Sequence, residues 1–171
     1  MPLFRYPEAG VPASVQARSV LAPAVAMVTI AELPLPQVFL RSGPFPGVRS
    51  VDGQPEAWDT PGLTRTPHFT DGGTVVETLV EVTPGSSFAY ELRDFTDVFG
   101  RLVAGVRGEW TFTPDGSGSV VRWTWEFKPA RRSRPALAAV IVPLYRRYMQ
   151  RVIDLSVELA ERAPLEAGAR R

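Results

Sequence analysis

The sequence contains no cysteine and only one histidine, His68, among its 171 residues. Without cysteine there can be no disulfide, no thiolate nucleophile and no metal site built on sulfur. One histidine is too few for the usual histidine-based zinc or iron centres. We therefore expect no metal and no other cofactor.

An excess of charge is also missing, because 19 basic side chains face 18 acidic ones and the formal net charge is +1. This balance gives no argument for nucleic acid or for an anionic membrane, and we expect no nucleic-acid partner. No apolar run approaches the roughly 20 residues that span a bilayer, and residues 1–8 lack the apolar core of a signal peptide. We therefore expect no integral membrane association. A cytoplasmic location is our interpretation, although a sequence without cysteine fits the periplasm equally well.

The length and the 44% hydrophobic content suit one domain with a sizeable core. We expect this domain to cover residues 14–162. A proline-containing arm at residues 1–13 would precede it as a loose segment, and a short frayed tail at residues 163–171 would follow it.

Two neighbouring segments rich in aromatic residues are the most informative positive feature. They are separated by a Pro-Asp-Gly turn at residues 114–116, and each alternates large aromatic with polar residues. Such alternation is typical of strands and gathers the aromatic side chains on one face. The residues concerned are Trp110, Phe112, Trp123, Trp125 and Phe127. A sheet with this face must be covered, and the only long cover available is the segment 135–162.

Other strand signals occur earlier in the chain, at residues 25–32, 48–51, 63–69, 74–82 and 87–95. The segment 25–32 is preferred as the first strand over the weakly alternating 14–21, because β-branched residues dominate it. Pro36 then suits the first turn of a short helix.

The pairing of residues 74–82 with 87–95 can be argued from the side chains. One register buries Val76, Val80 and Val82 together with Tyr90, whereas the other turns Glu77 inward. We prefer the apolar register.

The C-terminal third carries a helical pattern, with apolar residues at spacings of three and four. These are Leu137, Val140, Ile141, Leu144, Tyr148, Val152, Leu155 and Leu159. Pro143 lies inside the pattern and should kink the helix or start it afresh. From Pro143 to Arg162 the helix would be about 30 Å long, enough to lie across a sheet.

Several short motifs accompany this order of elements. They are Leu33-Pro34-Leu35-Pro36, Trp58 with Pro61-Gly62-Leu63-Thr64-Arg65, Asp71-Gly72-Gly73, Phe88-Ala89-Tyr90, Gly108-Glu109-Trp110 and Gly118-Ser119-Val120-Val121-Arg122-Trp123. Together they resemble the bacterial polyketide cyclase/dehydrase and lipid-transport family, a branch of the START-like superfamily that includes the birch-pollen allergen fold. The resemblance covers residues 25–159. It implies an α+β helix-grip fold, in which a curved antiparallel sheet of six to seven strands wraps around the C-terminal helix, with short helices after the first strand and a hydrophobic cavity inside.

The resemblance does not imply one reaction, because the superfamily includes carriers, hormone sensors, chaperone activators, aromatases and cyclases. The sequence shows no metal set, nucleophile triad or paired carboxylates. This favours the binding or transport of a small hydrophobic or amphipathic molecule, lipid- or polyketide-like, by a monomer or homodimer. The first alternative is a cofactor-independent polyketide cyclase, aromatase or dehydratase. The second is a protein-interaction module of the chaperone-activator kind, which would need an exposed apolar patch.

Three polar residues are candidates for chemistry. Period two places Arg65 and His68 on opposite faces of one strand, so we interpret His68 as an ordinary strand-end histidine. The resemblance implies that Arg65 faces inward, where it could hold a carboxylate or enolate by two parallel hydrogen bonds. An ion pair with Glu77 across the hairpin is the equally weighted alternative. Tyr90 could donate a hydrogen bond to a ligand carbonyl, or be satisfied by backbone. In the enzyme hypothesis Arg65 would polarise a carbonyl while Tyr90 or His68 moves protons.

The aromatic face could line a cavity or fill it, and we favour a partial cavity because of the resemblance. The residues expected to contact the ligand are Trp58, Arg65, Tyr90, Trp110, Trp123, Trp125, Tyr148 and Met149.

Overall fold

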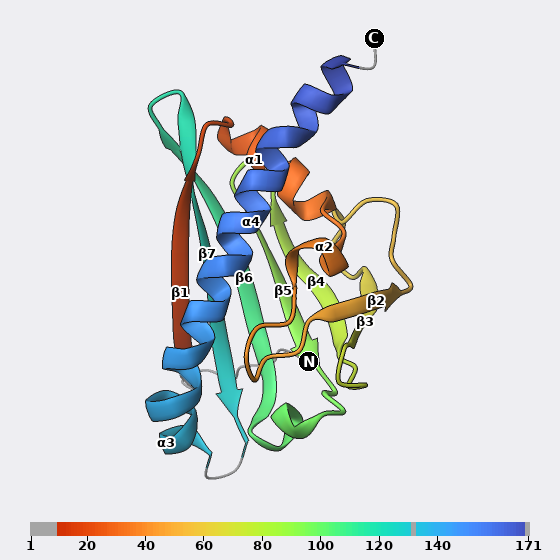
Figure 1. The fold of residues 1–171 in the computed structure, drawn as a ribbon, viewed down its shortest axis with the longest axis vertical. Helices are drawn as coiled ribbons and strands as arrows, with labels where there is room; N and C mark the ends of the chain where they lie inside the picture. The colour runs from red at the N-terminus through yellow and green to blue at the C-terminus, as the bar shows by residue number, and fades with distance from the viewer. Residues whose placement is uncertain (1–9, 131–132, 170–171) are drawn as a thin grey trace.

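The computed structural model describes residues 10–130 and 133–169, which form a curved antiparallel sheet crossed by one long helix (Figure 1). The strands are β1 (Val11–Ser19), β2 (Val48–Asp52), β3 (Thr64–Phe69), β4 (Val76–Thr83), β5 (Ser87–Arg93), β6 (Val103–Asp115) and β7 (Gly118–Pro129). The helical elements are α1 (Pro23–Glu32), α2 (Leu35–Val38), η1 (Val98–Arg101), α3 (Arg134–Ala136), the π-helical turn η2 (Leu137–Ile141) and α4 (Val142–Ala169). This is the helix-grip fold that the sequence predicts.

The sheet has the strand order β1-β7-β6-β5-β4-β3-β2, and all neighbours are antiparallel. The first strand therefore lies beside the last one, with Val15 opposite Trp123. Glu161 ties the end of this pair to α4, because its carboxylate accepts hydrogen bonds from the Ser19 hydroxyl and the Val20 amide, each at 2.9 Å. The start and the end of the described chain thus support each other.

The predicted first strand is wrong. Residues 25–32 belong to helix α1, and the weakly alternating segment before them forms β1. Pro23 occupies the first turn of α1, where its missing amide hydrogen costs nothing. Ala26, Met27 and Ile30 are the buried residues of α1, a helical spacing that outweighs the β-branched composition. The alternation of β1 is weak because two of its inward positions are small, Ala13 and Ala17.

The expected boundaries of the arm and the tail also shift. Strand β1 begins at Val11, so it includes three residues that we assigned to the arm, and residues 1–9 lie outside the described residues. Helix α4 continues to Ala169, past the expected start of the tail at Ala163. Residues 170–171 lie outside the described residues.

The aromatic face is confirmed. Trp110 pairs with Trp123, and Phe112 pairs with Val121, so the inward side chains of β6 and β7 meet across the strands. Trp123 and Phe127 are completely buried, and the indoles of Trp110 and Trp123 stack with their centroids 5.0 Å apart. Aromatic pairs of this kind add to the free energy gained by burial alone.

The register preferred for the β4–β5 hairpin is wrong over most of its length. Glu77 pairs with Leu92 and Leu79 pairs with Tyr90, so the glutamate faces inward. A β-bulge between Leu79 and Glu81 then reverses the alternation, and Val82 comes opposite Phe88. The buried carboxylate is tolerated because it has a partner on β3, described below.

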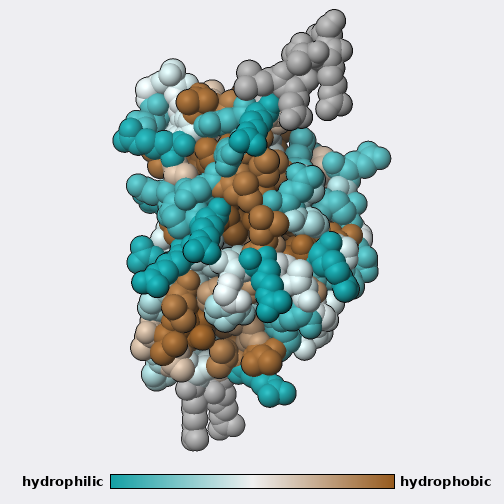
Figure 2. Space-filling view, in the orientation of Figure 1, coloured by the Kyte–Doolittle hydropathy of each residue, from teal (hydrophilic) through white to brown (hydrophobic). Residues whose placement is uncertain are grey.

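The helical segment of residues 134–169 passes Pro143 without a break, so the helix does not start afresh there. The π-helical turn Leu137–Ile141 precedes α4, and Pro143 lies in the first turn of α4, where it has no amide hydrogen to donate. Two members of the predicted apolar stripe, Val140 and Leu144, are exposed. Figure 2 shows a hydrophobic patch over this part of the molecule, at the lower left of the view.

The position of β1 in the sheet can be tested with neighbouring substitutions. Val15 is buried against the core, whereas Gln16 points to solvent. A Val15→Asp substitution should lower the free energy of unfolding by about 3 kcal/mol, because it buries an unpaired charge. Gln16→Asp should change it by less than about 0.5 kcal/mol. Urea denaturation measures both values, and similar values for the two variants would contradict the inward alternation of β1.

Candidate ligand-binding cavity

A cavity of about 380 Å³ lies between the sheet and the N-terminal half of α4. Strands β3, β4 and β5 form its floor, α1, α2 and the following loop contribute one side, and α4 covers it. Most of its lining is apolar, and includes Leu35, Phe39, Phe45, Val75, Leu92 and Phe95. Its size falls within the range of small-molecule sites.

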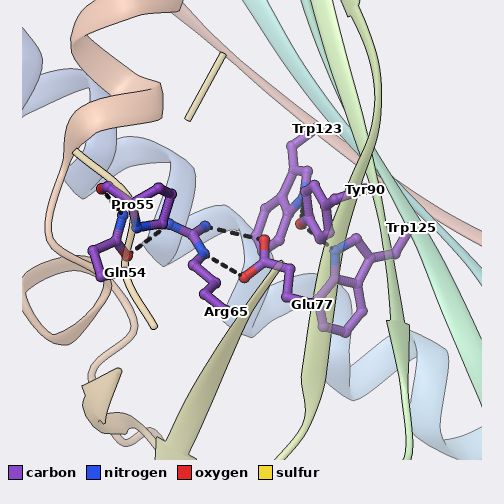
Figure 3. A network of polar contacts seen from close by, with 7 residues as sticks. All are labelled: Gln54, Pro55, Arg65, Glu77, Tyr90, Trp123 and Trp125. Carbon is purple, nitrogen blue, oxygen red and sulfur yellow. Dashed lines mark hydrogen bonds and ion pairs between the residues drawn. The ribbon is translucent and has the colours of Figure 1, made fainter. Parts of the chain in front are cut away.

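One wall of the cavity carries a buried ion pair between Arg65 and Glu77 (Figure 3). The two residues face each other across the β3–β4 pairing and are only 5% and 4% exposed. Arg65 donates two parallel hydrogen bonds to the carboxylate, from Nε to Oε2 at 2.8 Å and from Nη2 to Oε1 at 3.0 Å. Its remaining terminal nitrogen, Nη1, donates to Gln54 at 3.1 Å. The alternative in which Arg65 pairs with Glu77 is therefore confirmed, and the pair also lines the cavity.

Trp58 covers the other side of this ion pair. The Arg65 guanidinium carbon lies 4.1 Å from the centroid of the indole ring, a cation–π contact. The loop between β2 and β3 thus closes over the charged wall and keeps water from it. The indole Nε1 of Trp58 has no hydrogen-bond partner among the described residues, so this closure leaves one buried donor unsatisfied.

Tyr90 stands at the centre of the sheet wall. Its hydroxyl oxygen accepts a hydrogen bond from Nε1 of Trp123 at 2.9 Å and another from Nε1 of Trp125 at 2.8 Å (Figure 3). Burial and the nearby carboxylate of Glu77 raise the pKa of Tyr90 above its ordinary value of 10, so the phenol keeps its proton at neutral pH.

The ring of Tyr90 lies directly over Gly108 on the neighbouring strand. A side-chain carbon at position 108 would come 2.3 Å from Cζ of Tyr90, closer than any van der Waals contact allows. Only glycine leaves room for the ring at this place, so the motif Gly108-Glu109-Trp110 fixes the orientation of Tyr90.

Aromatic side chains of the sheet and of the loop after α2 contact tyrosines of the covering helix α4. Tyr145 of α4 stacks on Trp125 with centroids 4.8 Å apart, and Phe45 packs edge-on against Tyr145 at 5.1 Å. Burial raises the pKa of Tyr145 well above its ordinary value. Tyr148 also lines the cavity, and its hydroxyl lies 3.5 Å from the Pro46 carbonyl oxygen.

The segment around η1 borders one end of the cavity, with Phe95 and Phe99 in edge-to-face contact. Asp97 caps η1 by accepting a hydrogen bond from the Gly100 amide. Burial raises the pKa of Asp97, and the hydrogen bond from Gly100 partly opposes that rise. Val98 lines the cavity yet is 71% exposed, which places an opening at this segment.

Six of the eight residues predicted to contact a ligand line the cavity. These are Trp58, Arg65, Tyr90, Trp110, Trp125 and Tyr148. Trp123 and Met149 are instead fully buried in the core, because the aromatic residues around them fill that part of the interior. His68 is not part of the lining, and its Nε2 lies 2.8 Å from the Asp52 carboxylate on the neighbouring strand. This is the strand-end position that the sequence analysis favours.

Several lining residues were missed by the sequence analysis. The charge of Glu77 predicts an outward position, and only its pairing with Arg65 indicates the inward one. Phe95 and Phe99 lie on an irregular segment where no periodicity indicates direction. Tyr145 stands one turn before Met149 on α4 and could have been included from its helical spacing.

The described residues contain no group of three or more His, Asp or Glu side chains placed to hold a metal ion. None of the helices in the described part of the chain has the length and apolar character needed to cross a membrane.

The family model for polyketide cyclase/dehydrase and lipid transport matches residues 39–161. The chain belongs to this family. The match spans the cavity wall, the ion pair and most of α4. A search of curated protein sequences found no significant match.

Solved structures with the same fold are similar over most of their length. Ara h 8.0201 has a TM-score of 0.66 at 13% identity, covering 87% of this chain and 96% of that protein. The Zhui aromatase/cyclase from Streptomyces sp. R1128 has a TM-score of 0.65 at 15% identity, with 88% and 93% covered. The major latex-like protein 151 from Panax ginseng has a TM-score of 0.61 at 11% identity, with 87% and 97% covered. At these identities the likeness shows the fold and not the function.

The contact between Tyr90 and Gly108 predicts a coupled effect on stability. Gly108→Ala should lower the free energy of unfolding by about 1–3 kcal/mol, because the new methyl group collides with the ring. In a Tyr90→Ala background the same change should cost almost nothing, since the collision is gone. A double-mutant cycle by urea denaturation measures the coupling, and equal costs in both backgrounds would contradict the contact.

The buried ion pair predicts a second coupled effect. Glu77→Leu alone should lower the free energy of unfolding by about 3–5 kcal/mol, because the guanidinium of Arg65 stays buried without its partner. The double variant Arg65→Met with Glu77→Leu should recover most of that loss, since no charge remains inside. Chemical denaturation of the three proteins at neutral pH tests this. A single variant as stable as the parent would show that water reaches the pair.

Proposed function

We propose that this protein binds and carries a small, mainly apolar molecule in the cavity between its sheet and α4. The observation that carries the proposal is the cavity itself, about 380 Å³ of space with an apolar lining and an opening beside η1. A core built only for stability packs its side chains without a void of this size. The family, whose description joins lipid transport with polyketide chemistry, supports the same reading.

The arrangement of the aromatic residues supports binding rather than simple filling. Trp123 and Phe112 pack behind Phe39, Phe88 and Trp110, and these three residues line the cavity. Trp125, Tyr145 and Phe45 line the cavity as well and add aromatic surface to its wall. A flat apolar ligand would stack on these rings and be shielded from water.

A cyclase- or dehydratase-type enzyme is the second candidate function. It is favoured by the family description and by the polar groups of the wall, since Arg65 and Tyr90 lie where a carbonyl could be polarised. Such chemistry also needs a base to take a proton from the substrate. Glu77 accepts hydrogen bonds from Arg65 through both oxygens, and His68 stands outside the lining. The other two carboxylates of the lining, Asp71 and Asp97, accept hydrogen bonds from the backbone amides of Gly73 and Gly100, so binding remains the preferred function.

A substitution that fills the cavity tests the proposal directly. Leu92 faces the cavity from β5, whereas Thr78 of β4 points to the outer face of the sheet. Leu92→Trp should weaken binding of the neutral apolar dye N-phenyl-1-naphthylamine at least tenfold, because the indole occupies the ligand's space. Thr78→Trp should leave the affinity unchanged. Fluorescence titration measures both, with circular dichroism to confirm folding.

If Leu92→Trp does not fold, Leu92→Phe provides a smaller reduction of the same space. Equal affinity in the parent and in the folded cavity variants would overturn the proposal. Native mass spectrometry of the purified parent protein should also reveal a bound small molecule that is lost from the Leu92 variant.

A further inference from the structure

The hydroxyl group of Tyr90 can make one more hydrogen bond, in which its own proton is donated. A tyrosine hydroxyl can accept two hydrogen bonds and donate one. Both acceptor positions are filled, by Nε1 of Trp123 at 2.9 Å and by Nε1 of Trp125 at 2.8 Å. The two indoles also prevent the oxygen from accepting a further bond. Any additional partner of Tyr90 must therefore be an acceptor.

The described residues do not supply that acceptor. None of the hydrogen bonds among them uses the proton of Tyr90, although Tyr90 lines the cavity and its ring is held in place by Gly108. Glu77 is the carboxylate whose charge acts on Tyr90, and it is engaged by Arg65 through both oxygens. Burying a donor without a partner costs free energy. A ligand oxygen that accepts the Tyr90 proton would remove this cost, and this would add to the free energy of binding.

The donor strength of Tyr90 is raised by its neighbours. Hydrogen bonds in a chain polarise one another, and two N–H groups that donate to the phenol oxygen make its own O–H a stronger donor. Burial raises the pKa of Tyr90, so the proton is present across the physiological range. The group therefore acts as a fixed donor and not as an acid that releases its proton.

The charged wall determines what kind of oxygen can bind. Arg65 uses both of its parallel donors on Glu77 and its third nitrogen on Gln54, while Trp58 covers its face. The geometry in which a guanidinium holds a ligand carboxylate is thus already occupied by a carboxylate of the protein. A ligand anion would lose its hydration on entering this apolar space without gaining a cationic partner, and this desolvation would cost free energy.

We propose that the ligand is a neutral, flat, apolar molecule with a carbonyl oxygen, and that this oxygen accepts the proton of Tyr90 while the rings pack against the aromatic side chains that line the cavity beside it. This inference rests on the proposed binding function and adds to it a chemical class: ketones and related neutral carbonyl compounds, in preference to hydrocarbons and carboxylates. Tyr90 is the residue that selects them.

Three probes of nearly equal shape test this selection. 2-Acetylnaphthalene carries the carbonyl, 2-isopropenylnaphthalene replaces its oxygen by a methylene group, and 2-naphthoate replaces the ketone by a carboxylate. Affinities follow from competition with N-phenyl-1-naphthylamine. The parent protein should bind the ketone about tenfold or more tightly than the other two, as expected for one buried hydrogen bond.

The Tyr90→Phe variant removes the donor and keeps the ring. It should lose about tenfold in affinity for the ketone and should bind the alkene as well as the parent does. Tyr145→Phe is the matched control, because it removes the other tyrosine hydroxyl next to Trp125 and should preserve the preference for the ketone. Infrared spectra of the carbonyl-labelled ketone give a direct reading. The carbonyl stretch should shift to lower frequency in the parent protein and return to its apolar position in Tyr90→Phe.

The possible failures are distinguishable. If the ketone and the alkene bind the parent equally and the stretch is unshifted, the inference is wrong and the binding function stands. If Tyr145→Phe and not Tyr90→Phe removes the preference, the donor is wrongly assigned. If the dye and all three probes fail to bind, the proposed function falls, and this inference with it. The comparison of probes on the parent protein decides the matter even if Tyr90→Phe does not fold.

Discussion

The ion pair between Arg65 and Glu77 is the interaction on which the shape of the interior depends. Two charges removed from water are costly unless each satisfies the other, and here two parallel hydrogen bonds of 2.8 and 3.0 Å provide that satisfaction. The pair requires both side chains to point inward from β3 and β4. Because Glu77 points inward, the bulge after Leu79 is needed to turn Val82 toward the core again. The ion pair thus fits only one register of β3 and β4, whereas an apolar contact alone would allow the strands to shift relative to each other.

The interior has two parts with different character. Around Trp123 the side chains are packed to completion, with Phe39, Trp110 and Trp125 all in ring contact with it. Around Arg65 and Tyr90 the same sheet borders open space. Tyr90 joins the two parts, since its oxygen is held by the indoles of Trp123 and Trp125 while its side chain lines the cavity. The rigid part positions the group that faces the cavity, which is how a binding site is kept in one geometry.

The sequence predicts the fold well where large residues repeat with a clear period. The alternation in β6 and β7 places Trp110 and Trp125 on the inner face, and the helical spacing from Leu137 onward gives α4. It fails at residues 25–32, where β-branched side chains suggest a strand but a proline in the first turn and packing against α4 favour a helix. It fails at Glu77 because the penalty for burying a carboxylate is cancelled by a partner from another strand. Trp123 and Trp125 share one face and one residue type, so only the three-dimensional surroundings decide which of them borders the cavity.

The pairing of β1 with β7 has a consequence for how the chain folds. Val11 lies opposite Phe127 and Ser19 opposite Ser119, so the first described strand closes a loop of about a hundred residues. During synthesis β1 leaves the ribosome early, yet its partner does not exist until most of the domain has been made. After β7 has been made, this strand and its three large aromatic side chains stay exposed until β1 pairs with it, and contacts this distant in sequence form slowly. The order of strands that lets the two ends of the domain support each other therefore also makes the last stage of folding the one most exposed to aggregation.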